Sequence, residues 1–264
     1  MKQNQVAEKQ NTALALAGQF EEDADGGFET ADSSAYAIPF LTILQAGSPQ
    51  VKKSDGAYIK GAEEGMLFNT VTQQVLDGAA GVVVIPCAYK RTFIKWAARD
   101  SGGGFKGELP PSDPQVQAGV TDPDGRMIDG DGNLLSDTRT HYVLVLDDKG
   151  GYQPAVISLS STQIKKSRQW MSKMNGIKLI RPSDGTHYTP AMFSHTYRIT
   201  TGPESNDKGS WFGLKVETLG AVESAELYRA AKAFRDAVSS GEAKEQPQQA
   251  AASPAFNPDA EDAY

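Results

Sequence analysis

The chain has 264 residues, enough for one large domain or two small ones, and its 39% hydrophobic and 22% charged content is typical of a soluble protein with some disordered segments. No apolar run approaches the roughly 18 residues that span a bilayer, and the N-terminus lacks a signal-peptide core, so we expect a cytoplasmic protein. Cys87 is the single cysteine, which excludes an internal disulfide and a cysteine-based metal cluster.

The formal charge of −7 is unevenly distributed along the chain. Residues 1–37 carry a net charge of −5 and residues 239–264 a net charge of −4, whereas residues 38–238 hold 23 Lys/Arg against 21 Asp/Glu. The acidity therefore belongs to the two ends. A near-neutral body can still carry a local basic patch, and acidic tails can compete with nucleic acid for that patch.

Composition divides the chain into three parts. Residues 1–35 are polar and acidic, with little to bury, and are predicted to be disordered. Residues 36–238 contain the apolar periodicity expected of a single folded domain, and residues 239–264 return to Gln, Ala, Pro and acid as a disordered tail. The domain begins with predicted strands at residues 38–45, 58–60 and 66–71, separated by glycine and proline turns.

Residues 82–106 begin as an apolar run and then alternate after Pro86. Because every second side chain of a strand shares a face, one face is predicted to alternate aromatic and basic residues: Tyr89, Arg91, Phe93, Lys95 and Arg99. The opposite face, expected to be core, carries Thr92, Ile94, Trp96 and Ala98. Such an aromatic and basic face favours single-stranded nucleic acid as the ligand. The alternative is an amphipathic strand whose aromatics pack under a neighbouring loop.

Residues 101–132 contain SGGG, PPSDP, TDPDG and DGDG with hardly any apolar periodicity, which predicts a long loop or a loosely ordered hairpin excursion. Strands are then predicted at residues 141–146 and 152–159, joined as a hairpin by a turn at residues 147–151.

A helix is predicted to begin at Ser160, with Gln163 completing a capping box, and to end at Gly176. Six basic residues and no acidic residue lie between Gln163 and Arg181, with Trp170 among them. This favours a basic patch, and an ordinary solvated helix face is the alternative. Two more strands, at residues 193–200 and 211–218, and an amphipathic helix at residues 222–238 complete the domain; the last helix offers a surface for homo-oligomerisation.

Several short motifs bear on catalysis and metal binding. Residues 129–140 begin like a calcium loop, but Leu134 and Thr140 replace the glycine and glutamate that such a loop requires. The glycines before Lys106 do not form a phosphate-binding loop, because no Ser/Thr follows the lysine. The three histidines have no metal-ligand spacing, and no GxSxG elbow is present. We therefore expect no cofactor, no metal and no enzymatic activity.

The ending, Asp259-Ala-Glu261-Asp262-Ala-Tyr264, follows a Pro/Gln/Ala-rich linker and resembles the acidic, aromatic-ended tails of bacteriophage-type single-stranded DNA-binding proteins. The segments FLTILQAGSP, GMLFNTV, IKWAARDSGGGFKG and SSTQIKKSRQW also look like those of phage-encoded proteins of this size. The resemblance implies a mainly β fold with a few helices (α+β): an oligonucleotide-binding (OB)-like barrel with a long loop insertion, an inserted helix and a C-terminal helix.

The resemblance also implies which residues bind. Phosphates would be neutralised by basic residues: Arg91, Lys95, Arg99, Lys106, Lys165, Lys166, Arg168, Lys173 and Lys215. Bases would stack on Tyr89 and Phe93, or on Trp170 or Trp211 if these are exposed. The tail, with Asp259, Glu261, Asp262 and Tyr264, would occupy the groove without DNA and recruit replication or recombination proteins once DNA displaces it.

Two other functions are also compatible with the sequence. Asp147 and Lys149 follow an apolar strand in the order carboxylate–x–lysine, as in metal-dependent nucleases that process DNA, although a hairpin turn explains the same residues. A protein–protein interaction module, such as a virion component or an inhibitor of a host factor, is the second alternative, because a strand-rich fold does not decide function.

Overall fold

The computed structural model describes residues 16, 18–24, 26–30, 35–98, 104–123, 125–207 and 209–243. The chain divides into two units, residues 1–36 and residues 37–264. In the first unit, residues 18–22 are helical. In the second, an antiparallel sheet dominates, and no described helix is long and apolar enough to cross a membrane.

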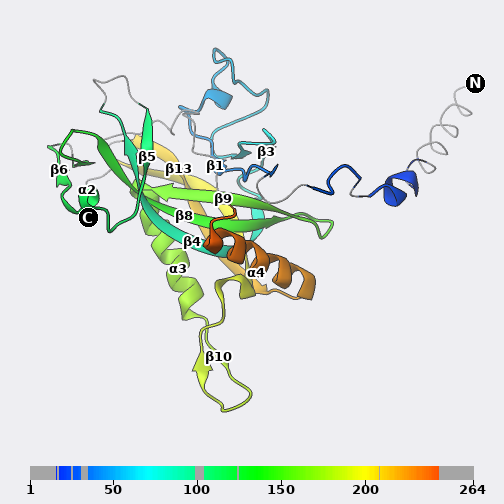
Figure 1. The fold of residues 1–264 in the computed structure, drawn as a ribbon. Helices are drawn as coiled ribbons and strands as arrows, with labels where there is room; N and C mark the ends of the chain where they lie inside the picture. The colour runs from blue at the N-terminus through cyan, green and yellow to red at the C-terminus, as the bar shows by residue number, and fades with distance from the viewer. Residues whose placement is uncertain are drawn as a thin grey trace, which may run out of the picture. The chain divides into compact units, whose positions relative to one another are not determined.

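Within the described residues the main sheet has eight strands, and its five longest run in the order β13-β12-β4-β8-β9, with every neighbouring pair antiparallel. They are β4 (Val82–Trp96), β8 (Leu134–Leu146), β9 (Tyr152–Ser160), β12 (His195–Asn206) and β13 (Gly209–Ala221). Figure 1 shows how strongly these long strands curve. A register shift between Pro86 and Ala88 marks an irregularity in β4 where it pairs with β8.

The sheet curls around two elements, β1 (Leu41–Ile43) and α3 (Ile164–Gly176). Each of them contacts both edge strands, β9 and β13, so the face that carries them is the inner face of a half-barrel. Helix α4 (Ala225–Ser240) contacts β4 and β8 and covers the outer face. The predicted mainly β, α+β fold is confirmed, and the curled antiparallel sheet is consistent with an OB-like arrangement.

Smaller elements surround this sheet. β1 pairs with β2 (Leu67–Asn69), which pairs with β3 (Val75–Leu76). Residues 101–132 were predicted to form a long loop or a hairpin excursion. Their described part is a hairpin excursion with four short elements: β5 (Phe105–Leu109), α2 (Pro114–Gln117), β6 (Val120–Thr121) and β7 (Met127–Ile128). A two-stranded arm, β10 (Leu179–Ile180) and β11 (His187–Tyr188), extends beyond α3 (Figure 1). Short 3-10 turns are η2 (Pro49–Val51), η4 (Ser161–Gln163) and η5 (Met192–Ser194).

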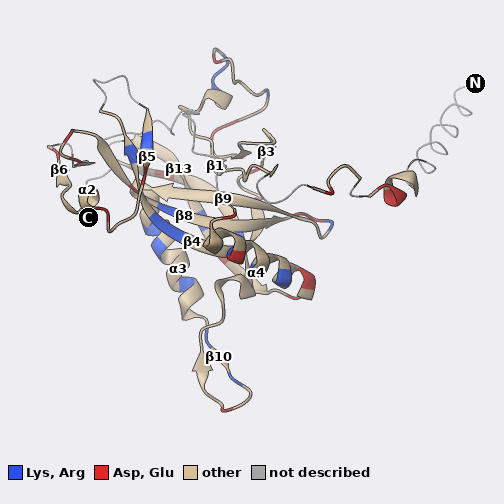
Figure 2. Ribbon diagram, in the orientation of Figure 1, with Lys and Arg blue, Asp and Glu red and all other residues tan. Residues whose placement is uncertain are grey.

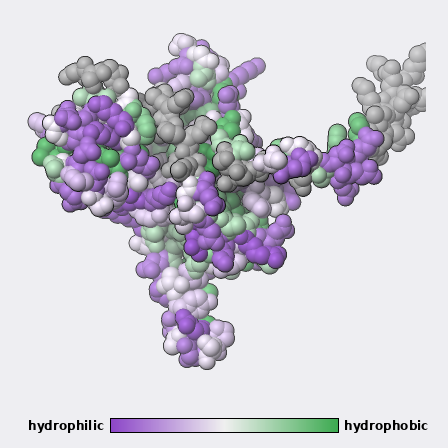
Figure 3. All heavy atoms as spheres, in the orientation of Figure 1, coloured by the Kyte–Doolittle hydropathy of each residue, from purple (hydrophilic) through white to green (hydrophobic). Residues whose placement is uncertain are grey.

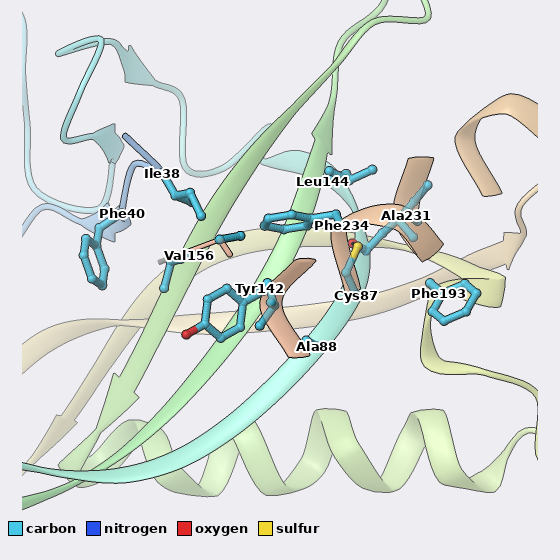
Figure 4. Close-up of a cluster of buried hydrophobic side chains, with 13 residues drawn as sticks. Ile38, Phe40, Cys87, Ala88, Tyr142, Leu144, Val156, Phe193, Ala231 and Phe234 are labelled. Carbon is cyan, nitrogen blue, oxygen red and sulfur yellow. The ribbon is translucent and has the colours of Figure 1, made fainter. Parts of the chain in front are cut away.

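The outer core lies between the sheet and α4 (Figure 4). Tyr142 of β8 meets Phe234 of α4 edge-to-face, with ring centroids 6.4 Å apart. The Ser224 hydroxyl accepts a hydrogen bond from the Leu227 N–H at the start of α4, and Gly241 ends the helix in the left-handed conformation, φ 80°. Cys87 is buried in this cluster, where loss of solvation raises its thiol pKa to about 12.

The inner core lies between the sheet and α3. Trp170 of α3 stacks on His141 of β8 with ring centroids 4.5 Å apart, and it meets Tyr197 of β12 edge-to-face. Nε2 of His141 shares a hydrogen bond of 2.8 Å with the Ser167 hydroxyl. Burial without a countercharge lowers the pKa of His141 to about 3, so the imidazole is neutral at physiological pH.

Side chains cover the free edge of strand β13 by bonding to backbone groups that point away from β12. They come from the residues after β1, from η4 and from α3. Gln45 accepts from the N–H of Phe212 and donates to its carbonyl. The Gln163 side-chain oxygen accepts from the N–H of Leu214, and the Lys173 ammonium donates to the carbonyl of Val216. The contacts of Gln163 and Lys173 attach α3 to the edge of the sheet.

The Gln163 contact explains one wrong prediction. The predicted capping box at Ser160 is absent, because Gln163 bonds to β13 and the helix begins after a 3-10 turn, at Ile164. Residues 58–60, predicted as a strand, have no strand structure. Strands β8, β12 and β13 extend well beyond their predicted bounds, because their ends are polar and escape an apolar pattern.

Candidate nucleic-acid interface

The alternating residues of β4 do share one face, as predicted, but it is the inner face. Tyr89 pairs with His141, Phe93 with Asp137 and Lys95 with Leu135. Directly opposed residues lie on the same side of a sheet, and His141 lies against α3. The aromatic and basic face predicted for solvent is therefore the face that the helix and the insertion cover.

Phe93 is only 5% exposed and packs with Val116 of α2 and Leu135 of β8. The prediction that it offers a ring to nucleic acid is wrong, because the insertion that follows β4 folds back over it. Trp96 and Ile94, predicted as core, are half-buried, and the Trp96 ring meets Phe105 edge-to-face with centroids 6.0 Å apart. The alternation was correct, but Phe93 is the most buried of these residues, whereas Ile94 and Trp96 on the other face remain half-buried.

Arg91 and Arg139 converge on one carboxylate. Arg91 contacts Asp137 through two nitrogens, at 2.8 and 3.2 Å, and Arg139 donates to the same carboxylate at 2.9 Å. A second Arg139 nitrogen donates to the Tyr89 hydroxyl at 3.0 Å. The Arg91 side chain is still 41% exposed, so this group keeps one excess positive charge at the surface.

Lys95 is bound more tightly. Its ammonium lies 2.6 Å from Asp129 and 2.6 Å from the side-chain oxygen of Gln115, and the Lys95 and Asp129 side chains are 13% and 3% exposed. Burial alone would raise the pKa of Asp129, but hydrogen bonds from Lys95, Asn133 and Asp131 outweigh it and hold the pKa well below its ordinary value. We assign Lys95 a structural role.

The same contacts bear on metal binding. The Asp129 carboxylate that a calcium loop would use accepts instead from Lys95 and from the turn that contains Asn133. Lys106 donates to the Asn133 side chain at 2.7 Å. Within the described ranges, no three His, Cys, Asp or Glu residues are grouped so as to hold a metal ion.

Trp170 is fully buried, with an exposed fraction of 0%. The prediction that it stacks on bases is wrong, because it is the largest side chain of the inner core. Its position follows from helical geometry: Ser167, Trp170 and Met174 recur at spacings of three and four and form the buried face of α3.

The opposite face of α3 is basic and exposed. Lys165, Arg168 and Lys173 lie on it, and the helix contains no Asp or Glu. In the described part of the chain, Lys165 and Arg168 have no ion-pair partner. The basic character continues into the arm with Lys178 and Arg181, both exposed. Figure 2 shows blue on α3 and on the adjoining strands, with no red on the helix.

The buried face of α3 contacts β8 close to Arg139. His141 contacts Ser167 of α3, and Arg139 precedes His141 by two positions on the same face of β8. Two positions along a strand span about 7 Å. Hydrophilic residues cover most of the face seen in Figure 3, with hydrophobic ones in small groups.

Trp211 and Lys215 lie on β13, on the other side of the hairpin from Leu214, as predicted from their alternation. Lys215 is exposed, and Trp211 is half-buried and donates its indole N–H to Glu204 at 3.1 Å. Glu204 also forms an ion pair with Lys166 of α3. The hairpin thereby brings Trp211 beside the N-terminal end of the basic helix.

Arg99 and the tail residues Asp259, Glu261, Asp262 and Tyr264 lie outside the described residues. Asp147 accepts from the backbone N–H groups of Lys149 and Gly151, at 2.8 and 2.7 Å, which is turn chemistry of the kind predicted as the alternative to a nuclease site.

A family model described as "Pam3 phage gp34-like protein" matches residues 7–244. The chain belongs to this phage gp34-like family. The match extends over the curled sheet, both long helices and the insertion, so a phage protein is indicated for the whole folded body. The search of curated proteins and the search of solved structures each found no match.

The sequence pattern did not predict the acidic residues that pair with the candidate cations of this gp34-like chain, nor the additional arginine beside them. Asp129, Asp137 and Glu204 neutralise cations predicted to face nucleic acid, and Arg139 adds one that was not predicted. The signal for two of them was present: Asp137 and Arg139 continue the alternation of β8 upstream of residue 141. The partnership of Glu204 with Lys166 spans 38 positions and has no local signal.

Proposed function

We propose that this phage gp34-like protein is a non-catalytic single-stranded DNA-binding protein that serves phage DNA replication or recombination in the host cytoplasm. The observation that carries the proposal is the exposed, acid-free basic face of α3. Lys165, Arg168 and Lys173 span about 12 Å along this helix, at a rise of about 1.5 Å per residue. Cations on a rigid element neutralise successive phosphates and release counterions, which favours binding irrespective of sequence.

The neighbouring groups extend this surface. The Arg91, Arg139 and Asp137 group contributes one excess positive charge, and Lys178 and Arg181 continue the basic surface into the arm. Lys173 donates to a backbone carbonyl, but an ammonium has three donors and can contact a phosphate as well. Trp211 supplies the aromatic surface, because Phe93 and Trp170 are buried.

The tail belongs to the same proposal. The acidic residues Asp259, Glu261 and Asp262, with Tyr264 at the end, would compete with DNA for the cations and recruit replication or recombination proteins when displaced. Deleting residues 254–264 should then tighten oligonucleotide binding at low salt. Unchanged or weaker affinity of the deletion variant would remove the tail from the mechanism.

The test of the proposal is a titration of the protein with oligo-dT over a series of salt concentrations. The Lys165→Gln/Arg168→Gln variant should bind roughly tenfold more weakly at low salt, and the slope of log affinity against log salt should fall by about 1.4, two phosphate contacts at about 0.7 each. Lys173 is left unchanged because it also bonds to β13.

The matched control is Arg229→Gln/Lys232→Gln on α4, which removes the same charge from the helix on the opposite side of the sheet. It should retain wild-type affinity and slope. Equal losses for the two variants, or no binding of the wild-type protein to oligo-dT at low salt, would overturn the proposal.

A further inference from the structure

Glu204 lies where an anionic ligand would bind. One of its carboxylate oxygens forms an ion pair with the ammonium of Lys166, and the other accepts from the indole N–H of Trp211 at 3.1 Å. Its two partners come from different elements, α3 and β13. A cation and an N–H donor that converge on two oxygens of one anion are the groups that bind a phosphate.

The pair is accessible to solvent. The Lys166 and Glu204 side chains are 25% and 22% exposed, and Trp211 is half-buried. An ion pair at this exposure contributes little to stability and exchanges readily with other ions. The carboxylate can therefore leave its two partners without unfolding the hairpin.

The backbone beneath the carboxylate leaves room for a ligand. Gly213 and Gly202 face each other across β12 and β13, next to the pair formed by Glu204 and Trp211. A Cβ added at Gly213 would lie 2.5 Å from the Glu204 carboxyl carbon, so this side chain rests directly on the backbone of the glycine. The Lys215 side chain lies over Gly202 in the same way. Both are flexible side chains whose ends can swing aside.

We propose that Lys166 and Trp211 form a nucleotide subsite that the Glu204 carboxylate occupies in place of a backbone phosphate until nucleic acid displaces it. The phosphate would take both contacts of Glu204, Lys215 would meet the next phosphate, and a base would stack on the Trp211 indole. This inference rests on the proposed function and adds to it an internal competitor: one acidic side chain in the folded body that lowers affinity for single strands.

The test compares Glu204→Gln with the wild-type protein in oligo-dT titrations over a salt series. The glutamine keeps an oxygen for the Trp211 N–H and removes the charge opposite Lys166. Binding should tighten by about two- to fivefold, which corresponds to the strength of an exposed ion pair, and the salt slope should steepen by about 0.7. The control is Asp236→Asn on α4, a carboxylate paired with Arg235, which changes the net charge equally.

Tryptophan fluorescence supplies a second readout. Trp170 is buried and the half-buried Trp96 lies on β4, outside the proposed subsite, so oligo-dT should change mainly the emission of Trp211, and Trp211→Phe should abolish most of that change while binding persists. If the wild-type protein binds oligo-dT but Glu204→Gln behaves like wild type or like Asp236→Asn, the subsite is wrong and the proposed function stands. If neither wild type nor Glu204→Gln binds oligo-dT, both proposals are wrong.

Discussion

Strand β4 and helix α3 both carry aromatic and basic residues at regular spacing, but their cations have different partners. On β4, the insertion buries Phe93, and Asp137 and Asp129 neutralise Arg91 and Lys95. On α3, the aromatic residue points into the core and the exposed cations Lys165 and Arg168 meet no carboxylate. A basic and aromatic pattern in the sequence must therefore be weighed against the acidic side chains that the rest of the fold brings to it.

The largest effect should come from Trp170, which tests whether the tryptophan of α3 is core or contact. Trp170→Ala removes a fully buried indole stacked on His141 and should lower the free energy of unfolding by about 3–5 kcal/mol. Chemical denaturation measures it. Trp211→Ala, at a half-buried position, is the control and should cost far less; equal losses would contradict the assignment.

The second effect tests whether Lys95 is structural. Lys95→Met leaves the buried Asp129 carboxylate without its cation and should cost about 2–3 kcal/mol of unfolding free energy at neutral pH. Because the folded-state pKa of Asp129 is depressed, the stabilisation exists above its ordinary value near 4 and disappears as the pH falls through the lower folded-state value. Denaturation of wild type and variant at several pH values should show the curves converging in acid. A constant difference would exclude the ion pair as its cause.

The third effect concerns His141 on the same inner face. Its pKa is about 3 in the folded protein, below the ordinary 6.5, so the unfolded chain binds the proton more readily and stability falls as the pH drops from about 6.5 toward 3. At pH 5 this amounts to about 2 kcal/mol relative to pH 8. His141→Gln should show a shallower loss between pH 8 and pH 5 in denaturant titrations. An identical slope would show that the imidazole does not titrate as its burial requires.

The smallest effect compares one arginine from each face. Arg168→Gln should weaken oligo-dT binding about three- to fivefold, whereas Arg91→Gln should weaken it only about twofold, because Arg91 shares the Asp137 carboxylate with Arg139 and the group contributes a single excess charge. Parallel salt titrations of the two variants provide the comparison. A larger loss for Arg91→Gln would return the binding site to the inner face of β4.

The fold was more predictable than the site. Apolar alternation located the cores of β4, β8, β9 and β13, and helical spacing placed α3 and α4 within a few residues. These signals are local, because the period of a strand or helix is written in neighbouring residues. The capping box failed because Gln163 bonds to Leu214, a contact between residues 51 positions apart.

The candidate site depends on contacts between residues that are far apart in the sequence. The alternation of Tyr89 to Lys95 was predicted correctly. However, α3 and the insertion decide which face of β4 is buried, and the sequence of β4 does not show where these elements pack. The exposed cations Lys165 and Arg168 were predictable, because an acid-free amphipathic helix must place its charges opposite its apolar face. Glu204 was not, since its two partners come from α3 and β13.

The side chains bonded to strand β13 also affect how the protein behaves at high concentration. An open edge strand presents unpaired N–H and C=O groups to strands of other molecules, and such pairing starts aggregation. Here Gln45, Gln163 and Lys173 already hold the outward groups of Phe212, Leu214 and Val216. A strand from a second molecule would have to displace all three side chains before it could add to the sheet. We therefore expect the residues that close the half-barrel also to protect the hairpin of β12 and β13 from edge-to-edge pairing.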